Sequence, residues 1–218
     1  LTVLFQSLSG AVTTWLMDNL EQSNYQRLHM GTLIYVGILA IVSVGVILLA
    51  PEIVWILGGV QYKQAVALIP GMTFAILLQS IGSIFTIILT YDKNVTRTAF
   101  ATGIIAGLSI IAKFSTLPIF GIQSLPFINI VTYSALLIVN YLLVKKAGYG
   151  KVVDIKGILM IIVVAMLFLL ASFTLYEHLY LRFLVLIIFV LFGLVFVYRK
   201  RVWLLAMIKK KNSSNNIE

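Results

Sequence analysis

The chain has 218 residues, of which 61% are hydrophobic and only 11% are charged, and its mean hydropathy is +1.07. A soluble domain is about 45–50% apolar with about a quarter of its residues charged, so this composition excludes an ordinary soluble globule. The absence of cysteine excludes disulfides and thiolate metal sites. The net charge of +9 does not indicate nucleic-acid binding, because the cations lie between apolar runs, as they do in membrane proteins.

Seven apolar runs follow one another along the chain, at residues 1–17, 32–49, 64–91, 98–117, 122–144, 157–176 and 179–198. A spanning helix needs about 20 apolar residues, and only helices or closed barrels satisfy the backbone in lipid. The runs do not alternate with period two, which favours helices. We therefore predict an all-α membrane bundle of about seven transmembrane helices.

The segment between the second and third runs predicts a short elbow at the membrane surface. Pro51 cannot continue the preceding helix as a hydrogen-bond donor. The pair Gly58-Gly59 allows the chain to reverse, and the amphipathic rings of Trp55 and Tyr62 suit a headgroup layer. The elbow would join two spanning helices.

Lys and Arg are unevenly distributed between the runs, with thirteen in one set of alternate linkers and the C-terminal tail, and three in the other set. The positive-inside rule places the richer side in the cytoplasm, so we predict a cytoplasmic C-terminus and an outward-facing elbow. The seven Asp and Glu residues all lie at run ends or in loops. The sequence therefore offers no mid-membrane carboxylate for a proton, a sodium ion or a cationic drug.

Packing within the bundle can also be predicted in part. Pro70-Gly71 predicts a kink near the outer end of the third run. Gly103 and Gly107 form a GxxxG pattern, which we interpret as a packing face. The last two runs are apolar on every face, which places them at the periphery and the third to fifth runs around a polar interior.

Two segments carry a resemblance to a known family. The first is Ala50-Pro51-Glu52-Ile53, followed by a Gly-Gly turn and a tyrosine, and the second runs from Lys113 through Pro118 and Gly121. Both resemble the polysaccharide transporters, the O-antigen and capsule repeat-unit flippases of the multidrug/oligosaccharidyl-lipid/polysaccharide exporter superfamily. The second segment is similar to the family's Asn-x4-Pro-x-x-Gly-Ile turn, with lysine where asparagine is usual. The resemblance covers roughly residues 14–146, although Thr14 stands where the family commonly has a proline.

The resemblance implies the C-terminal lobe of a two-lobed transporter of roughly 12–14 helices, which works by alternating access in the bacterial plasma membrane. It implies five core spans in residues 1–146, two peripheral helices in 147–198 and a basic cytoplasmic tail in 199–218. The implied substrate is an undecaprenyl-diphosphate-linked oligosaccharide, and the implied partners are membrane lipid and the missing N-terminal lobe. A multidrug or cation antiporter and a membrane polysaccharide polymerase remain alternatives.

The candidate cavity residues are polar side chains of the third to fifth runs: Gln79, Ser83, Lys113, Asn129 and Asn140. Amides and hydroxyls in membranes often only link helices, and each such hydrogen bond contributes about 1 kcal/mol or less to stability. Each of these residues can therefore either line a substrate cavity or only link two helices. Lys113 lies about 7.5 Å from the predicted outer end of its helix. It can snorkel to the interface or attract a pyrophosphate or acidic sugar. The sequence holds no catalytic constellation, so we predict no enzyme, cofactor or metal.

Overall fold

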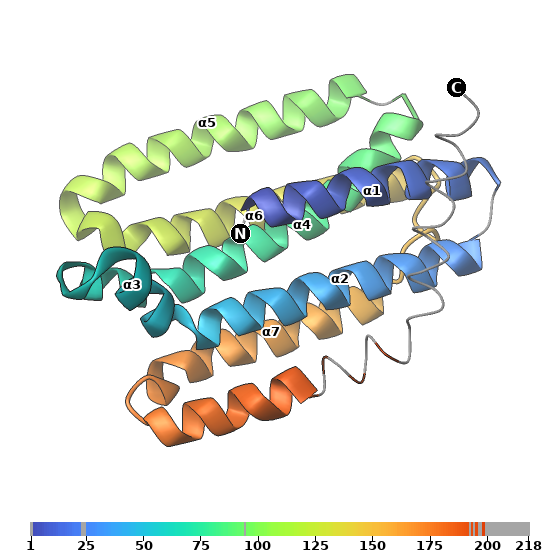
Figure 1. The fold of residues 1–218 in the computed structure, drawn as a ribbon. Helices are drawn as coiled ribbons and strands as arrows, with labels where there is room; N and C mark the ends of the chain where they lie inside the picture. Colours follow the sequence, from blue (N-terminus) through green and yellow to red (C-terminus); the bar gives the residue numbers. More distant parts are fainter. Residues whose placement is uncertain are drawn as a thin grey trace, which may run out of the picture. The chain divides into compact units, whose positions relative to one another are not determined.

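The computed structural model describes residues 2–22, 25–93 and 95–191, together with residues 193, 195 and 198. Within this part of the chain all regular structure is helical (Figure 1), which confirms the all-α prediction. The elements are α1 (Thr2–Glu21), α2 (Tyr25–Leu48), α3 (Ala50–Gly58), η1 (Val60–Ala67), α4 (Ile69–Tyr91), α5 (Val95–Phe120), η2 (Gly121–Ser124), α6 (Leu125–Lys146) and α7 (Ile155–Leu175).

The chain divides into two compact units, Leu1–Glu177 and His178–Glu218. The first unit holds all the elements named above. The second contains a short apolar helix, Leu179–Leu191. The predicted basic tail, residues 199–218, lies outside the described residues.

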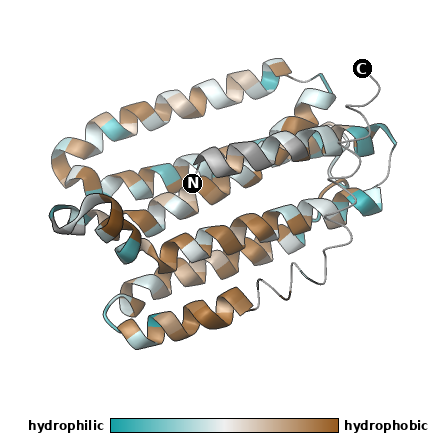
Figure 2. Ribbon diagram, in the orientation of Figure 1, coloured by the Kyte–Doolittle hydropathy of each residue, from teal (hydrophilic) through white to brown (hydrophobic). Residues whose placement is uncertain are grey.

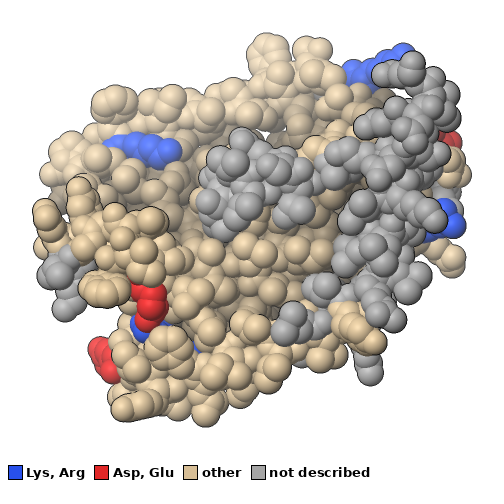
Figure 3. Space-filling view, viewed as in Figure 1, with Lys and Arg blue, Asp and Glu red and all other residues tan. Residues whose placement is uncertain are grey.

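Four segments of the described chain are long and apolar enough to cross a membrane: Tyr25–Leu48, Gln64–Tyr91, Val95–Lys146 and Ile155–Leu175. Hydrophobic residues predominate along these segments (Figure 2). The third segment has 52 residues and comprises α5, η2 and α6, with a change of direction at Gly121, whose φ is +65°. Figure 3 shows one face, on which residues other than Lys, Arg, Asp and Glu predominate. A membrane protein is the class that these apolar helices fit.

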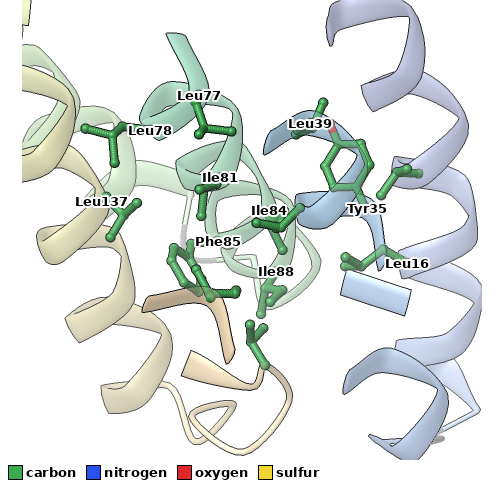
Figure 4. Packing of buried hydrophobic residues seen from close by; sticks show 14 of the residues in the cluster. Leu16, Tyr35, Leu39, Leu77, Leu78, Ile81, Ile84, Phe85, Ile88 and Leu137 are labelled. Atoms are coloured by element: carbon green, nitrogen blue, oxygen red, sulfur yellow. The ribbon is translucent and has the colours of Figure 1, made fainter. Parts of the chain in front are cut away.

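Helix α4 is the centre of the first unit, because it contacts α1, α2, α6 and α7. It supplies 8 of the 24 buried residues of the hydrophobic core, more than any other helix, and Figure 4 shows this core from close by. Ile81, Ile84, Phe85 and Ile88 are completely buried there. Burial of each such side chain contributes about 1.5–3 kcal/mol relative to exposure in water.

Helices α4 and α6 run parallel and form the most extensive helix contact of the first unit. Gly71 allows this close approach, since a Cβ atom there would lie 2.6 Å from the Pro126 Cβ. A Cβ atom at Gly82 would lie 4.0 Å from the Leu137 Cα, which is an ordinary van der Waals contact. The two glycines are eleven residues apart, which is about three helical turns, so they share one face of α4.

A second pair of helices, α2 and α7, is joined at both ends. The His29 Nε2 atom contacts the Lys151 carbonyl oxygen, and the Tyr176 hydroxyl donates a hydrogen bond of 2.5 Å to the Ile47 carbonyl. Between these contacts, Gly157 brings α7 close to Leu33 of α2. The two helices are therefore parallel, like α4 and α6.

The glycines of α5 do not pack as the sequence predicted. Helix α5 packs mainly on α6, and the Thr132 hydroxyl of α6 donates to the Ser109 hydroxyl of α5 at 3.0 Å. A Cβ atom added at Gly103 or Gly107 would meet no heavy atom within 4 Å. Within the described residues, the interpretation of this GxxxG pattern as a packing face is therefore wrong, because α6 contacts another side of α5.

Two prolines occupy helix starts, which corrects the predicted kink. Pro51 lies in the first turn of α3 and Pro70 in the first turn of α4. Proline is favoured there because its missing N–H would be unpaired in any helix. Pro70 therefore begins a helix and does not kink one. Pro118 lies inside α5, which continues to Phe120.

The elbow consists of α3 and η1, separated by Gly59, whose φ is +68°. This left-handed conformation favours glycine over residues with side chains. Trp55 and Leu57 are exposed by 70% and 82%, and Tyr62 is also exposed. A short helix with exposed aromatic and aliphatic side chains suits the membrane interface that the sequence predicts.

Candidate functional site

Four of the five candidate cavity residues lie along one edge of the contact between α4 and α6. On α4, Gln79 and Ser83 are four residues apart and therefore share one side of the helix. On α6, Asn129 and Asn140 are eleven residues apart, about three turns, and share one face. Both asparagines contact α4. We call the side chains of Met72, Gln79, Ser83, Thr86, Asn129 and Asn140 the polar seam.

Asn140 is the most buried member of the polar seam, with an exposed fraction of 4%. Its Nδ2 atom donates to the Thr86 hydroxyl at 3.2 Å, and that hydroxyl donates to the Gly82 carbonyl at 3.3 Å. The Asn140 Oδ1 atom is buried and has no hydrogen-bond partner among the described residues. An unpaired buried acceptor costs about 1–3 kcal/mol, so this oxygen is available to a donor that enters the seam.

Asn129 links α4 and α6 near the start of both helices, whereas Asn140 links them nearer their ends. Its Nδ2 atom donates to the Met72 sulfur at 3.2 Å. A thioether is a weak acceptor, so this bond is easily exchanged for a better one. Met72 and Thr86 are fourteen residues apart on α4, so the two asparagines contact α4 about 21 Å apart along its axis.

Gln79 and Ser83 lie between these two contacts. Gln79 is exposed, and Ser83 is half-buried with its hydroxyl donating to the Ser80 carbonyl at 2.7 Å within the same helix. The Gln79 amide is therefore the most accessible hydrogen-bonding group of the polar seam. The seam combines accessible and buried polar groups in helices that are mostly apolar.

Lys113 is half-buried on α5 and does not belong to the polar seam. Because α5 and α6 are antiparallel and Ser109 contacts Thr132, Lys113 lies level with Ile128, next to Asn129. Helix α5 ends at Phe120, so Lys113 lies about 10.5 Å from the end of its helix, deeper than the sequence predicted. At this depth a lysine needs a polar environment or a long reach to the interface.

The end of the first unit away from the elbow, where α4 and α6 end, carries most of its charge. The rings of Tyr91 and Tyr149 meet edge to face there, with centroids 6.3 Å apart. Burial raises the pKa of the Tyr149 phenol, and the Asp92 carboxylate raises it further. Asp154 caps α7 by accepting a 3.2 Å hydrogen bond from the Gly157 amide.

The polar seam predicts measurable coupling between Asn140 and Thr86. In a double-mutant cycle with Asn140→Leu and Thr86→Val, we expect a coupling free energy of about 0.5–1.5 kcal/mol, because each substitution alone removes their hydrogen bond. Reversible unfolding in mixed micelles measures it. The cycle of Asn140→Leu with Thr132→Val is the matched control, since Thr132 bonds Ser109 instead. Equal coupling in both cycles would contradict the assignment.

The sequence alone did not single out some members of these contacts. Thr86 and Met72 become functional candidates only because α6 places an asparagine against each of them. Ser109 and Thr132 are both polar residues in apolar runs, but the sequence does not show that they contact each other. The sequence places Thr86 on the same broad side of the third run as Gln79, and the signal that could have found Met72 is its spacing of seven residues from Gln79, which places it near that side.

No protein-family model, curated protein or solved structure matches this chain. Its function is therefore inferred from its residues and their geometry.

Proposed function

We propose that this chain is the C-terminal lobe of a flippase that moves lipid-linked oligosaccharide repeat units from the inner to the outer face of a bacterial plasma membrane. The observation that carries the proposal is the polar seam, where amides and hydroxyls line one edge of a helix pair in an apolar unit. Such groups match the hydroxyls and amides of a sugar chain, which exchange hydrogen bonds without a net charge.

The seven-span arrangement is part of the same proposal. In it, α1, α2, α4, α5, α6, α7 and the segment that contains Leu179–Leu191 each cross the membrane. The lengths of α5 and α6, 26 and 22 residues, support two separate crossings within the 52-residue apolar segment. The two lobes of the transporter would then rock around the polar seam.

The distribution of charge supports the proposed orientation. Seven of the nine Lys and Arg residues of the first unit lie where α4 and α6 end and where α2, α5 and α7 begin, at the ends of these helices away from the elbow. The elbow side carries only Lys63 and Lys113. The positive-inside rule favours a cytoplasmic location for the rich end, which would place the elbow outside.

An antiporter for drugs or cations is the second candidate within the same superfamily. Such transporters need a carboxylate within the membrane to bind a cation or proton. All seven Asp and Glu residues of this sequence lie at run ends or in loops. This chain alone therefore supports a polar substrate without positive charge better than a cationic one.

Disruption of the gene tests the proposed function. We expect lipid-linked repeat units to accumulate on the cytoplasmic leaflet and surface polysaccharide to be lost, because synthesis continues while translocation stops. A glycosidase that cannot cross the membrane is added before and after the cells are opened. The fraction of repeat units cleaved only after opening gives the fraction on the cytoplasmic leaflet.

A strain that lacks the first glycosyltransferase is the control, since it loses surface polysaccharide without accumulating repeat units. Normal surface polysaccharide in the disrupted strain, with no second transporter of this kind, would disprove the proposal.

A further inference from the structure

A small pocket lies at the charged end of the first unit, away from the polar seam. It is formed where α4 and α6 end and α5 begins, and it is a shallow hollow at the surface with a cavity volume of about 10 Å³, so a ligand group would rest at its mouth. Its lining combines two cationic side chains with an apolar floor: Leu89, Arg97, Leu143, Lys146 and Ala147. The proposed transport of sugars gives this pocket no role.

The two cations of the pocket come from different helices. Arg97 lies in the first turn of α5, and Lys146 is the last residue of α6. The guanidinium of arginine binds phosphate oxygens through two parallel N–H donors, whereas lysine acts as a compact point charge. The first-turn amides of a long helix add positive potential beside Arg97. Together these groups favour an anion with several oxygens.

The surroundings of the pocket are also positive on balance. Near it in the chain are Lys93 and Lys145, and the single carboxylate in these segments is Asp92. The carbonyl groups at the C-terminal end of α6 oppose an anion, and Lys145 and Lys146 lie in that last turn, where they offset the helix dipole. An anion that reaches the pocket therefore meets more positive than negative charge.

The floor of the pocket distinguishes a lipid from a soluble anion. Leu89 is buried, and Leu143 is half-buried beside it. The pocket also lies at the ends of helices that are apolar enough to span a membrane, which is the level of lipid headgroups. An acyl chain can follow the apolar helices while its headgroup remains at the cations.

We propose that this pocket binds the phosphate group of an anionic membrane lipid, held by Arg97 and Lys146 above the apolar side chains of Leu89 and Leu143. The site is independent of the proposed flippase activity, because it uses no residue of the polar seam. Its occupation would fix the start of α5 against the end of α6.

The test compares two double variants of the purified protein. Arg97→Gln with Lys146→Gln removes both cations of the pocket, and Lys151→Gln with Lys156→Gln removes two cations from the loop before α7 and from its first turn. Native mass spectrometry measures retention of dioleoylphosphatidylglycerol. Dioleoylglycerol, which has the same acyl chains without phosphate, and inorganic phosphate are the comparison ligands.

We expect the pocket variant to bind phosphatidylglycerol about thirtyfold more weakly than the wild type, the loss expected for two cations at headgroup level. The control variant should stay within about twofold, and the diglyceride should not distinguish the proteins. If the pocket variant does not fold, Arg97→Gln and Lys146→Gln alone should each weaken binding about fivefold.

Three outcomes would overturn the proposal. Equal losses in both double variants would indicate a diffuse surface charge effect. Equal binding of the diglyceride would show that the phosphate is not recognised. Binding of inorganic phosphate that depends on Arg97 and Lys146, without binding of the lipid, would assign the pocket to a free phosphate.

Discussion

Replacement of Gly71 by leucine is expected to lower the free energy of unfolding by about 3 kcal/mol, because it forces α4 and α6 apart. A Cβ atom at Gly71 would already lie 2.6 Å from the Pro126 Cβ, and the proline ring cannot rotate away as a flexible side chain can. These two helices make the most extensive contact of the first unit. The midpoint of reversible unfolding in mixed micelles measures the loss.

Gly103→Leu is the matched control, since a Cβ atom there meets no heavy atom within 4 Å. It should change the free energy of unfolding by less than about 1 kcal/mol, and in the stabilising direction, because leucine has the higher helix propensity. Adding Pro126→Gly to the Gly71 variant should recover part of the loss. Equal losses at Gly71 and Gly103 would show that the effect does not come from the α4–α6 contact.

The helical class of the fold could be predicted from the sequence, because in lipid the backbone must pair with itself. Long apolar runs without period two leave the helix as the available structure. The runs at residues 32–49 and 157–176 accordingly match α2 and α7 to within a few residues at one end or both. Proline was less informative, since the same residue can begin a helix, as Pro70 does, or lie near the end of one, as Pro118 does.

The partners of the polar side chains could not be predicted in the same way. Periodicity places Asn129 and Asn140 on one face of α6, but it does not say which helix that face meets. The answer depends on Gly71, which lets α4 approach Pro126 of α6, and on the loops that make α4 and α6 parallel. The prediction that Gly103 and Gly107 form a packing face of α5 was wrong for the same reason. A GxxxG pattern indicates that a close approach is possible, but it does not indicate that a partner helix is present.

Lys113→Ala is expected to reduce export of the lipid-linked repeat unit at least about tenfold, while the amount of protein in the membrane stays within about twofold. The side chain is half-buried, level with Ile128 beside Asn129, and lies about 10.5 Å from the end of α5. A cation at this depth can attract the pyrophosphate or an acidic sugar before it leaves on the outer side. Tenfold corresponds to about 1.4 kcal/mol of lost attraction.

Lys113→Arg keeps the charge and should retain most of the export, which separates the charge from the shape of the side chain. Lys156→Ala removes an exposed cation from the first turn of α7 and should leave export unchanged. If Lys113→Ala exports normally, the lysine is an interfacial anchor whose ammonium reaches the headgroups along its own apolar stem. The sugar-binding role would then rest on the uncharged polar seam, where the Asn140 Oδ1 atom is the buried acceptor without a described partner.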